Sequence, residues 1–194
     1  MVTATLIALI LAASLLGMRS GRFLDWAVLR PYFIARRMRY WGLITSGFVH
    51  ADVGHLLFNL ITFYSFGFAL ERAIGAEAFA ILYLIGLLAS GVGTTLKHRD
   101  DPQYASLGAS GAILAVLFAC ILYFPRQRLT ILPIPIGIPA PWFAIGYLAL
   151  TYYWSRQPRG RINHDAHLSG ALAGLAFVAV TDPQRYGLFL HALA

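Results

Sequence analysis

The stretch Leu107–Phe124, LGASGAILAVLFACILYF, places one serine at the start of an otherwise apolar helix, with Gly108 and Gly111 on either side of it. Pro125 ends this helix, because proline has no amide hydrogen and its ring clashes with the preceding turn. About fifteen helical residues rise roughly 22 Å, whereas the hydrocarbon of a bilayer is roughly 30 Å thick. If Pro125 and Arg126 lie at one interface, Ser110 therefore lies below the opposite one.

Ser110 has two interpretations, a packing residue or a nucleophile. A serine in a membrane helix commonly bonds to nearby backbone or packs against a neighbouring helix. A helix N-terminus, however, presents unpaired amide groups and a partial positive charge that would stabilise an oxyanion. The reactive interpretation requires a base from elsewhere in the chain.

The composition predicts a multi-pass integral membrane protein. Hydrophobic residues make up 59% of the chain and charged residues 12%, with a mean hydropathy of +0.68, whereas soluble domains carry about a quarter charged residues. Apolar runs of helical length favour an all-α bundle over a barrel. The single Cys120 excludes an internal disulfide and a thiolate metal cluster. The net charge of +7 sits beside apolar runs, so we expect contact with the lipid bilayer and no nucleic acid.

The apolar runs predict six transmembrane helices in one domain, residues 1–194, which no linker divides. Residues 1–18 lack the basic start of a signal peptide, so we expect a retained helix there. Asp52 is a candidate N-cap and Gly75 a candidate end of the second helix. Residues 19–50, interrupted by Pro31, are rich in arginine and aromatic residues and should lie in the membrane interface. The six expected helices are 1–18, 52–74, 76–96, 110–124, a helix after Pro141 that ends near Trp154, and one from His164 to before Pro183; the tail after it has no predicted role.

Alternation across the membrane brings five polar residues to one face. The second, fourth and sixth helices all begin on the same side, so their first turns lie at similar depth. Such convergence of ionisable groups inside a bilayer is typical of a functional site. The residues are His50, His55, Ser110, His164 and His167.

His55 and Asn59 are four residues apart and share a helix face. They can bond to a neighbouring helix, or they can donate to a developing oxyanion. For the pair alone, the packing interpretation is favoured.

His167 is the candidate base. Gly170 and Gly174 follow it at small-residue spacing, and Gly111, Ala115 and Ala119 form a similar stripe on the Ser110 helix. Two such stripes permit close backbone approach and would bring the imidazole to the Ser110 hydroxyl.

The other polar residues near His167 are less suitable. His164 lies nearer the surface and is expected at the rim of the site. Asp165, two residues from His167, points elsewhere on the helix and is a poor third member, so a Ser-His dyad is predicted. The histidines could suggest a metal site, but no HExxH motif and no suitably placed carboxylate is present, so no metal is expected.

Three motifs together resemble the rhomboid family of intramembrane serine proteases: GFVHADVGHLLFNL at 47–60, GASGAI at 108–113 and AHLSGALAG at 166–174. The resemblance extends to motif order and spacing over most of the chain. It implies a six-helix bundle in a bacterial inner (plasma) membrane that cleaves transmembrane protein substrates without a cofactor. A catalytically inactive rhomboid-like protein that binds membrane helices is the alternative, and a metal- or haem-binding membrane protein is a more distant one.

The resemblance also implies roles for single residues. Ser110 would be the nucleophile and His167 the general base and acid, while His55, Asn59 and the Ser110 amide would form the oxyanion hole. His50 would shape the cavity, and Trp41 and Glu71 match further family positions. The sequence departs from the family in having Gly42 after that tryptophan and Leu114 where an aromatic residue often stacks on the histidine.

Membrane orientation is predicted differently by charge and by resemblance. Basic residues concentrate in the loops on the face of Ser110, which places that face in the cytoplasm by the positive-inside rule. Resemblance to bacterial rhomboids implies the outer face, and we favour it because the arginines at 19–50 can contact lipid. The basic residues on the face of Ser110 are Arg19, Arg22, Arg30, Arg36, Arg37, Arg39, Lys97, Arg99, Arg156, Arg159 and Arg161.

Overall fold

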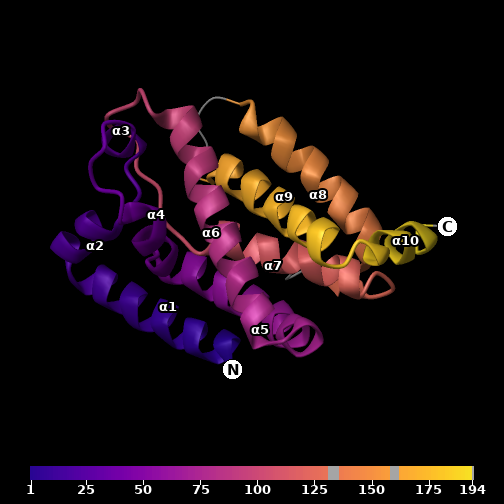
Figure 1. The fold of residues 1–194 in the computed structure, drawn as a ribbon. Coiled ribbons are helices and arrows are strands. Elements are labelled where there is room, and N and C mark those ends of the chain that lie inside the picture. Colours follow the sequence, from indigo (N-terminus) through magenta and orange to yellow (C-terminus); the bar gives the residue numbers. More distant parts are fainter. Residues whose placement is uncertain (131–135, 158–161, 194) are drawn as a thin grey trace.

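The computed structural model describes residues 1–130, 136–157 and 162–193 and shows an all-α bundle (Figure 1). A short helix, α7, lies in the middle, and longer helices pack around it. Six of the described helices have 14 residues or more, and α7 is the shortest of them: α1 (Val2–Arg19), α5 (Val53–Ile74), α6 (Ala76–His98), α7 (Ser110–Tyr123), α8 (Ala140–Ser155) and α9 (His164–Thr181).

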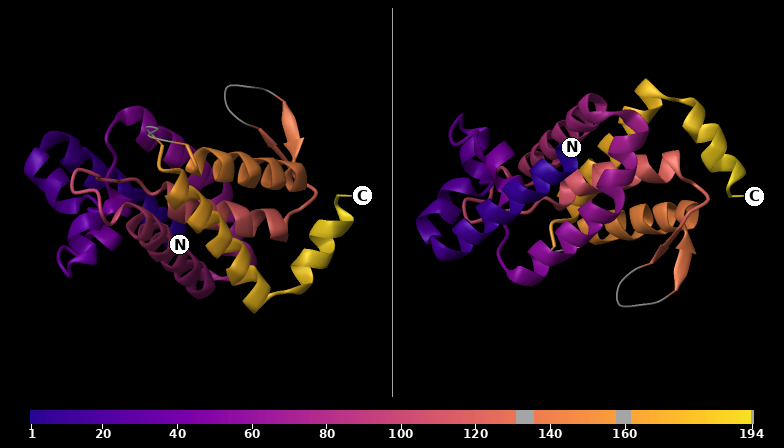
Figure 2. Two further views of the ribbon diagram at one scale, coloured as in Figure 1. Left: turned by 90° about the horizontal axis from the view of Figure 1, so that it is seen from above. Right: turned by 90° about the horizontal axis from the view of Figure 1, so that it is seen from below.

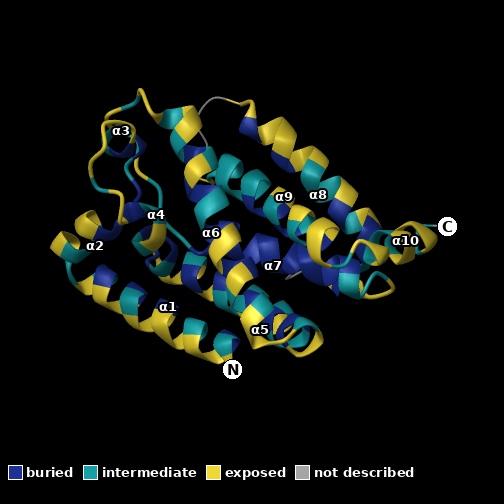
Figure 3. Ribbon diagram, in the orientation of Figure 1, coloured by how far each residue is buried: buried dark blue, intermediate teal, exposed yellow. Residues whose placement is uncertain are grey.

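The central position of α7 follows from its composition. Every residue from Gly111 to Leu122 is buried, and a helix that is apolar on all sides is suited to a position covered by other helices. Its neighbours α5, α6 and α9 supply that cover. The outer helices keep large apolar side chains exposed, such as Leu9, Leu57 and Trp142, and their outward faces are yellow in Figure 3. Such faces suit lipid rather than water.

Three helices, α1, α5 and α6, are long and apolar enough to cross a membrane among the described residues. Helices α7, α8 and α9 do not meet this criterion, because they are too short or too polar. Helix α7 has 14 residues and α8 has 16, while the first turn of α9 carries His164, Asp165 and His167. Integral membrane character is therefore supported, and the predicted count of six crossings stays a prediction.

The predicted boundaries of α5 are confirmed. The Asp52 carboxylate accepts the His55 amide at 2.8 Å, and Gly75 ends the helix with a φ of 84°. On α9 the cap is Asn163, whose side chain accepts the Ala166 amide at 3.0 Å.

Residues 19–50 are more helical than the sequence suggested. Pro31 opens a helix instead of interrupting the chain, because its missing amide hydrogen costs nothing at the first helical position. The segment consists of α2 (Gly21–Ala27), α3 (Pro31–Ala35), α4 (Gly42–Thr45) and a 3₁₀ turn, η1 (Ser46–Phe48). Figure 2 shows this cluster at one end of the bundle, away from the C-terminus.

Two arginine side chains bond to Asp25 within this cluster. Arg30 donates to Asp25 at 2.5 Å, which holds the pKa of that exposed carboxyl below its ordinary value. Arg39 approaches the other carboxylate oxygen at 3.4 Å.

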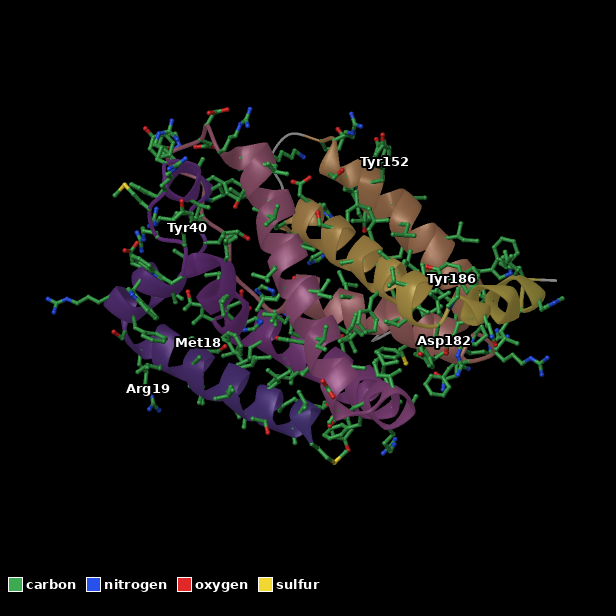
Figure 4. The ribbon with its side chains drawn as sticks, in the orientation of Figure 1. Met18, Arg19, Tyr40, Tyr152, Asp182 and Tyr186 are labelled. Atoms are coloured by element: carbon green, nitrogen blue, oxygen red, sulfur yellow. The ribbon has the colours of Figure 1, made fainter. Side chains whose placement is uncertain are left out.

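A short strand pair and a C-terminal helix were also not predicted. A short antiparallel pair, β1 (Arg128–Thr130) with β2 (Gly137–Pro139), precedes α8. The tail forms α10 (Gln184–His191), anchored by the Tyr186 hydroxyl, which donates to the Leu175 carbonyl at 2.7 Å (Figure 4). Arg159 and Arg161, two of the basic residues predicted on the face of Ser110, lie outside the described residues.

Candidate active site

The first turns of α7 and α9 bring Ser110 and His167 together. His167 Nε2 lies 2.7 Å from Ser110 Oγ, a distance typical of a strong hydrogen bond. Ser110 is the first residue of α7, and His167 lies one turn inside α9. A hydroxyl beside an imidazole is the arrangement that activates a serine nucleophile.

Helix α9 meets α7 at Gly170 and Gly174, which we call the glycine seam, and this close packing explains the proximity of Ser110 and His167. A Cβ on Gly170 would lie 2.0 Å from the Gly111 carbonyl oxygen, and a Cβ on Gly174 would lie 2.2 Å from that of Ala115. These are impossible contacts for any other residue, so α9 can approach α7 this closely only with glycine at both positions.

His50 binds the backbone just before Ser110. Its Nε2 accepts the Ala109 amide at 3.3 Å, and its Nδ1 lies 2.9 Å from Ser14 Oγ. Ser14 donates to the Phe48 carbonyl at 3.0 Å, so its oxygen is available to accept from Nδ1–H. The chain of bonds from α1 to Ala109 therefore sets the tautomer of this fully buried ring.

His55 lies against the Gly108 loop, and Asn59 lies one turn further along α5. The His55 ring packs edge-on against His50, with centroids 4.8 Å apart. It also lies against Gly108, where a Cβ would be 2.7 Å from the ring and φ is 115°. Asn59 Nδ2 donates to the His55 carbonyl at 3.0 Å, so one of its two amide hydrogens bonds within α5.

Tyr147 on α8 is a site residue that sequence reasoning missed. Its hydroxyl lies 3.1 Å from His167 Nδ1, on the opposite edge of the imidazole from Ser110. The sequence signal was weak, since one tyrosine in an aromatic helix has no spacing that relates it to His167. Ser14 was missed for the same reason, as a single serine in an apolar helix.

Asp165 and His164 precede His167 in the first turn of α9. The Asp165 carboxylate pairs with Lys97 at 2.8 Å and His98 at 3.1 Å, and so ties α9 to the end of α6. The His164 ring lies 6.1 Å from that of His167, centroid to centroid, and 5.3 Å from that of Trp154. Within the described ranges, no three His, Cys, Asp or Glu side chains converge as metal ligands would.

A family model for the rhomboid domain matches residues 37–183, which is most of the chain and includes every residue of the site except Ser14.

The chain belongs to the rhomboid family.

Relatives of this rhomboid occur in bacteria and in mitochondria. It is 34% identical over 148 residues to the Bacillus subtilis protein named "Putative rhomboid protease YdcA", covering 75% of this chain and 70% of that one. It is 29% identical over 187 residues to the RHOMBOID-like protein 12, mitochondrial, of Arabidopsis thaliana, covering 83% of this chain and 55% of that one. It is 34% identical over 146 residues to the human presenilin-associated rhomboid-like protein, mitochondrial, covering 70% of this chain and 36% of that one.

The other residues that the resemblance singled out have structural contacts of their own. Trp41 donates from Nε1 to the Trp26 carbonyl at 2.8 Å and stacks on that ring, so it holds the α2–α4 cluster together. Glu71 accepts the backbone amides of Val2 at 2.7 Å and Thr3 at 2.9 Å, and so pins the start of α1 to the end of α5. Leu114 is buried in α7.

Proposed function

We propose that this rhomboid is an intramembrane serine endopeptidase that cleaves the transmembrane segments of other proteins with a Ser110–His167 dyad. The observation that carries the proposal is the 2.7 Å contact between Ser110 Oγ and His167 Nε2. It occurs at the N-terminus of a buried helix inside an apolar bundle, where a packing serine would need no imidazole.

The chemistry follows from that contact. His167 Nε2 takes the proton as Ser110 Oγ attacks the peptide carbonyl, and the same imidazole then gives the proton to the leaving amine. The oxyanion would meet the Ser110 amide at the start of α7, with His55 and Asn59 as candidate side-chain donors. Water, activated by His167 in turn, releases the acyl group.

Water access and substrate entry extend this proposal. The 14 residues of α7 rise about 21 Å, so in a six-helix bundle Ser110 lies below the membrane surface but can be reached by water. A cavity of about 20 Å³, lined by polar and apolar side chains alike, lies beside Gly108 and has room for about one water molecule. We propose that α8 is the lateral gate through which the substrate enters. A cross-link from α8 to α5 that leaves cleavage unchanged would exclude that gate. The membrane we propose is a bacterial inner membrane.

The competing function is an inactive rhomboid-like protein that only binds membrane helices, and mitochondrial relatives carry the name rhomboid-like. The intact hydroxyl–imidazole pair favours the enzyme. A fluorophosphonate probe separates the two, because it forms a covalent bond only with an activated serine.

The test compares labelling of purified wild type, Ser110→Ala and His167→Ala in detergent. Ser65→Ala is a matched control, because Ser65 only bonds to its own helix, at the Ile61 carbonyl. We expect labelling of wild type and the control and none of the two dyad variants. Equal labelling of wild type and Ser110→Ala would overturn the proposal.

A further inference from the structure

Tyr147 presents the one hydroxyl that the structure places against the far nitrogen of the catalytic imidazole, within the part of the chain described. Its oxygen is 3.1 Å from His167 Nδ1, while Nε2 of the same ring meets Ser110 at 2.7 Å. The phenol ring is wedged between Phe118 of α7 and Phe143 of α8, each with centroids 5.7 Å away. Aromatic packing thus fixes the position of the hydroxyl.

The direction of the bond follows from the work His167 has to do. A base must present an unprotonated Nε2 to the Ser110 hydroxyl, so the ring hydrogen of the neutral imidazole lies on Nδ1. Nδ1–H then donates to the Tyr147 oxygen. If the tyrosine instead donated to Nδ1, the hydrogen would lie on Nε2 and the imidazole could not take the proton of Ser110.

The usual acceptor for this hydrogen in soluble serine hydrolases is a carboxylate, but the carboxylate two residues before His167 in α9 bonds to other side chains. Asp165 pairs with Lys97 and His98 at the end of α6. An isolated carboxylate placed at Nδ1 instead would be expensive to bury in an apolar bundle. A phenol oxygen accepts the same hydrogen, and its dipole stabilises the positive charge of the imidazolium without adding a second buried charge.

We propose that Tyr147 is the positioning residue of His167, which holds the imidazole in the Nδ1–H tautomer and in line with Ser110. The proposal rests on the proposed protease function and deepens it. Because Tyr147 belongs to α8 and the dyad to α7 and α9, the base is aligned only while α8 is seated against α9. Movement of α8 away from the bundle would release Nδ1–H and misalign the base until α8 returns.

The test is Tyr147→Phe, which removes one oxygen and keeps the ring contacts with Phe118 and Phe143. Tyr153→Phe, the same change at a side chain 59% exposed on α8, is the matched control. We expect kcat for a transmembrane reporter to fall about tenfold with KM unchanged, the value of roughly one hydrogen bond. Labelling by a small fluorophosphonate should slow by a similar factor. Because that probe does not need a lateral gate, slower labelling would report on the dyad and not on substrate entry.

A spectroscopic measurement tests the bond without activity. Nitrogen-15 NMR of histidine-labelled protein distinguishes the two imidazole tautomers, and we expect His167 to carry its hydrogen on Nδ1 in wild type and in Tyr153→Phe. In Tyr147→Phe the tautomers should mix.

The outcomes separate this proposal from the protease assignment. If wild type is neither labelled nor active, the protease assignment fails, and the tautomer measurement still decides the role of Tyr147. If wild type is active, then unchanged kcat, labelling and tautomer in Tyr147→Phe overturn the positioning role. A change confined to KM would also overturn it, because it would make Tyr147 a substrate contact.

Discussion

Gly170→Ala adds a single methyl group where α9 meets α7 and should move His167 away from Ser110. A Cβ at this position would lie 2.0 Å from the carbonyl oxygen of Gly111, whereas real Cβ contacts shorter than 3.0 Å are essentially never found. The obstructing atom is backbone of a buried helix and cannot rotate aside. Helix α9 must therefore retreat from α7 by about 1 Å.

The catalytic cost follows from where His167 lies on the retreating helix. It is one turn before Gly170, so its imidazole moves with the backbone, and the Nε2–Oγ distance of 2.7 Å grows to about 3.7 Å, beyond hydrogen-bond range. A misplacement of about 1 Å costs on the order of a hundredfold in rate. Overpacking of this kind also lowers the free energy of unfolding by about 1–3 kcal/mol.

The assay is fluorophosphonate labelling of Ser110, normalised to the folded fraction from a thermal melt in detergent. Gly146→Ala on α8 is the control, because a Cβ there meets nothing within 4 Å. We expect the control to label at the wild-type rate. Wild-type labelling by a folded Gly170→Ala protein would refute the claim that the seam sets the Ser110–His167 distance.

Three further variants test the supporting contacts, each by thermal unfolding in detergent. Ser14→Ala leaves the buried His50 Nδ1–H without its acceptor and should cost about 1–3 kcal/mol; an unchanged melt would show that the ring has another partner. Glu71→Gln loses one of two charge-assisted bonds to the start of α1, with an expected cost of about 1–2 kcal/mol while labelling per folded molecule stays constant. Tyr83→Phe should stabilise by about 1 kcal/mol, because this buried hydroxyl has no hydrogen-bond partner among the described residues; a lower midpoint would contradict that.

Sequence patterns predicted the contacts that depend on spacing along one helix. Asp52 and Gly75 bound α5 as predicted because caps are local chemistry. Gly170 and Gly174 face Gly111 and Ala115 because small residues four apart form a continuous stripe, and a stripe on each helix leaves few ways to pack them.

Contacts that depend on the rotation of a helix about its own axis were not predictable in this way. Helix α8 is apolar and aromatic on several faces, so nothing in its pattern shows that Tyr147 points inward while Tyr153 is exposed. Ser14 on α1 poses the same difficulty. The number of crossings is also undetermined by pattern, because α7, α8 and α9 are shorter or more polar than an ordinary membrane span.

The most direct measurement compares cleavage of a transmembrane reporter by wild type and Ser110→Ala, each reconstituted in lipid vesicles with confirmed folding. The 2.7 Å contact of this serine with His167 predicts cleavage by wild type and none above background by the variant. Equal cleavage by the two proteins would contradict the assignment of Ser110 as the nucleophile.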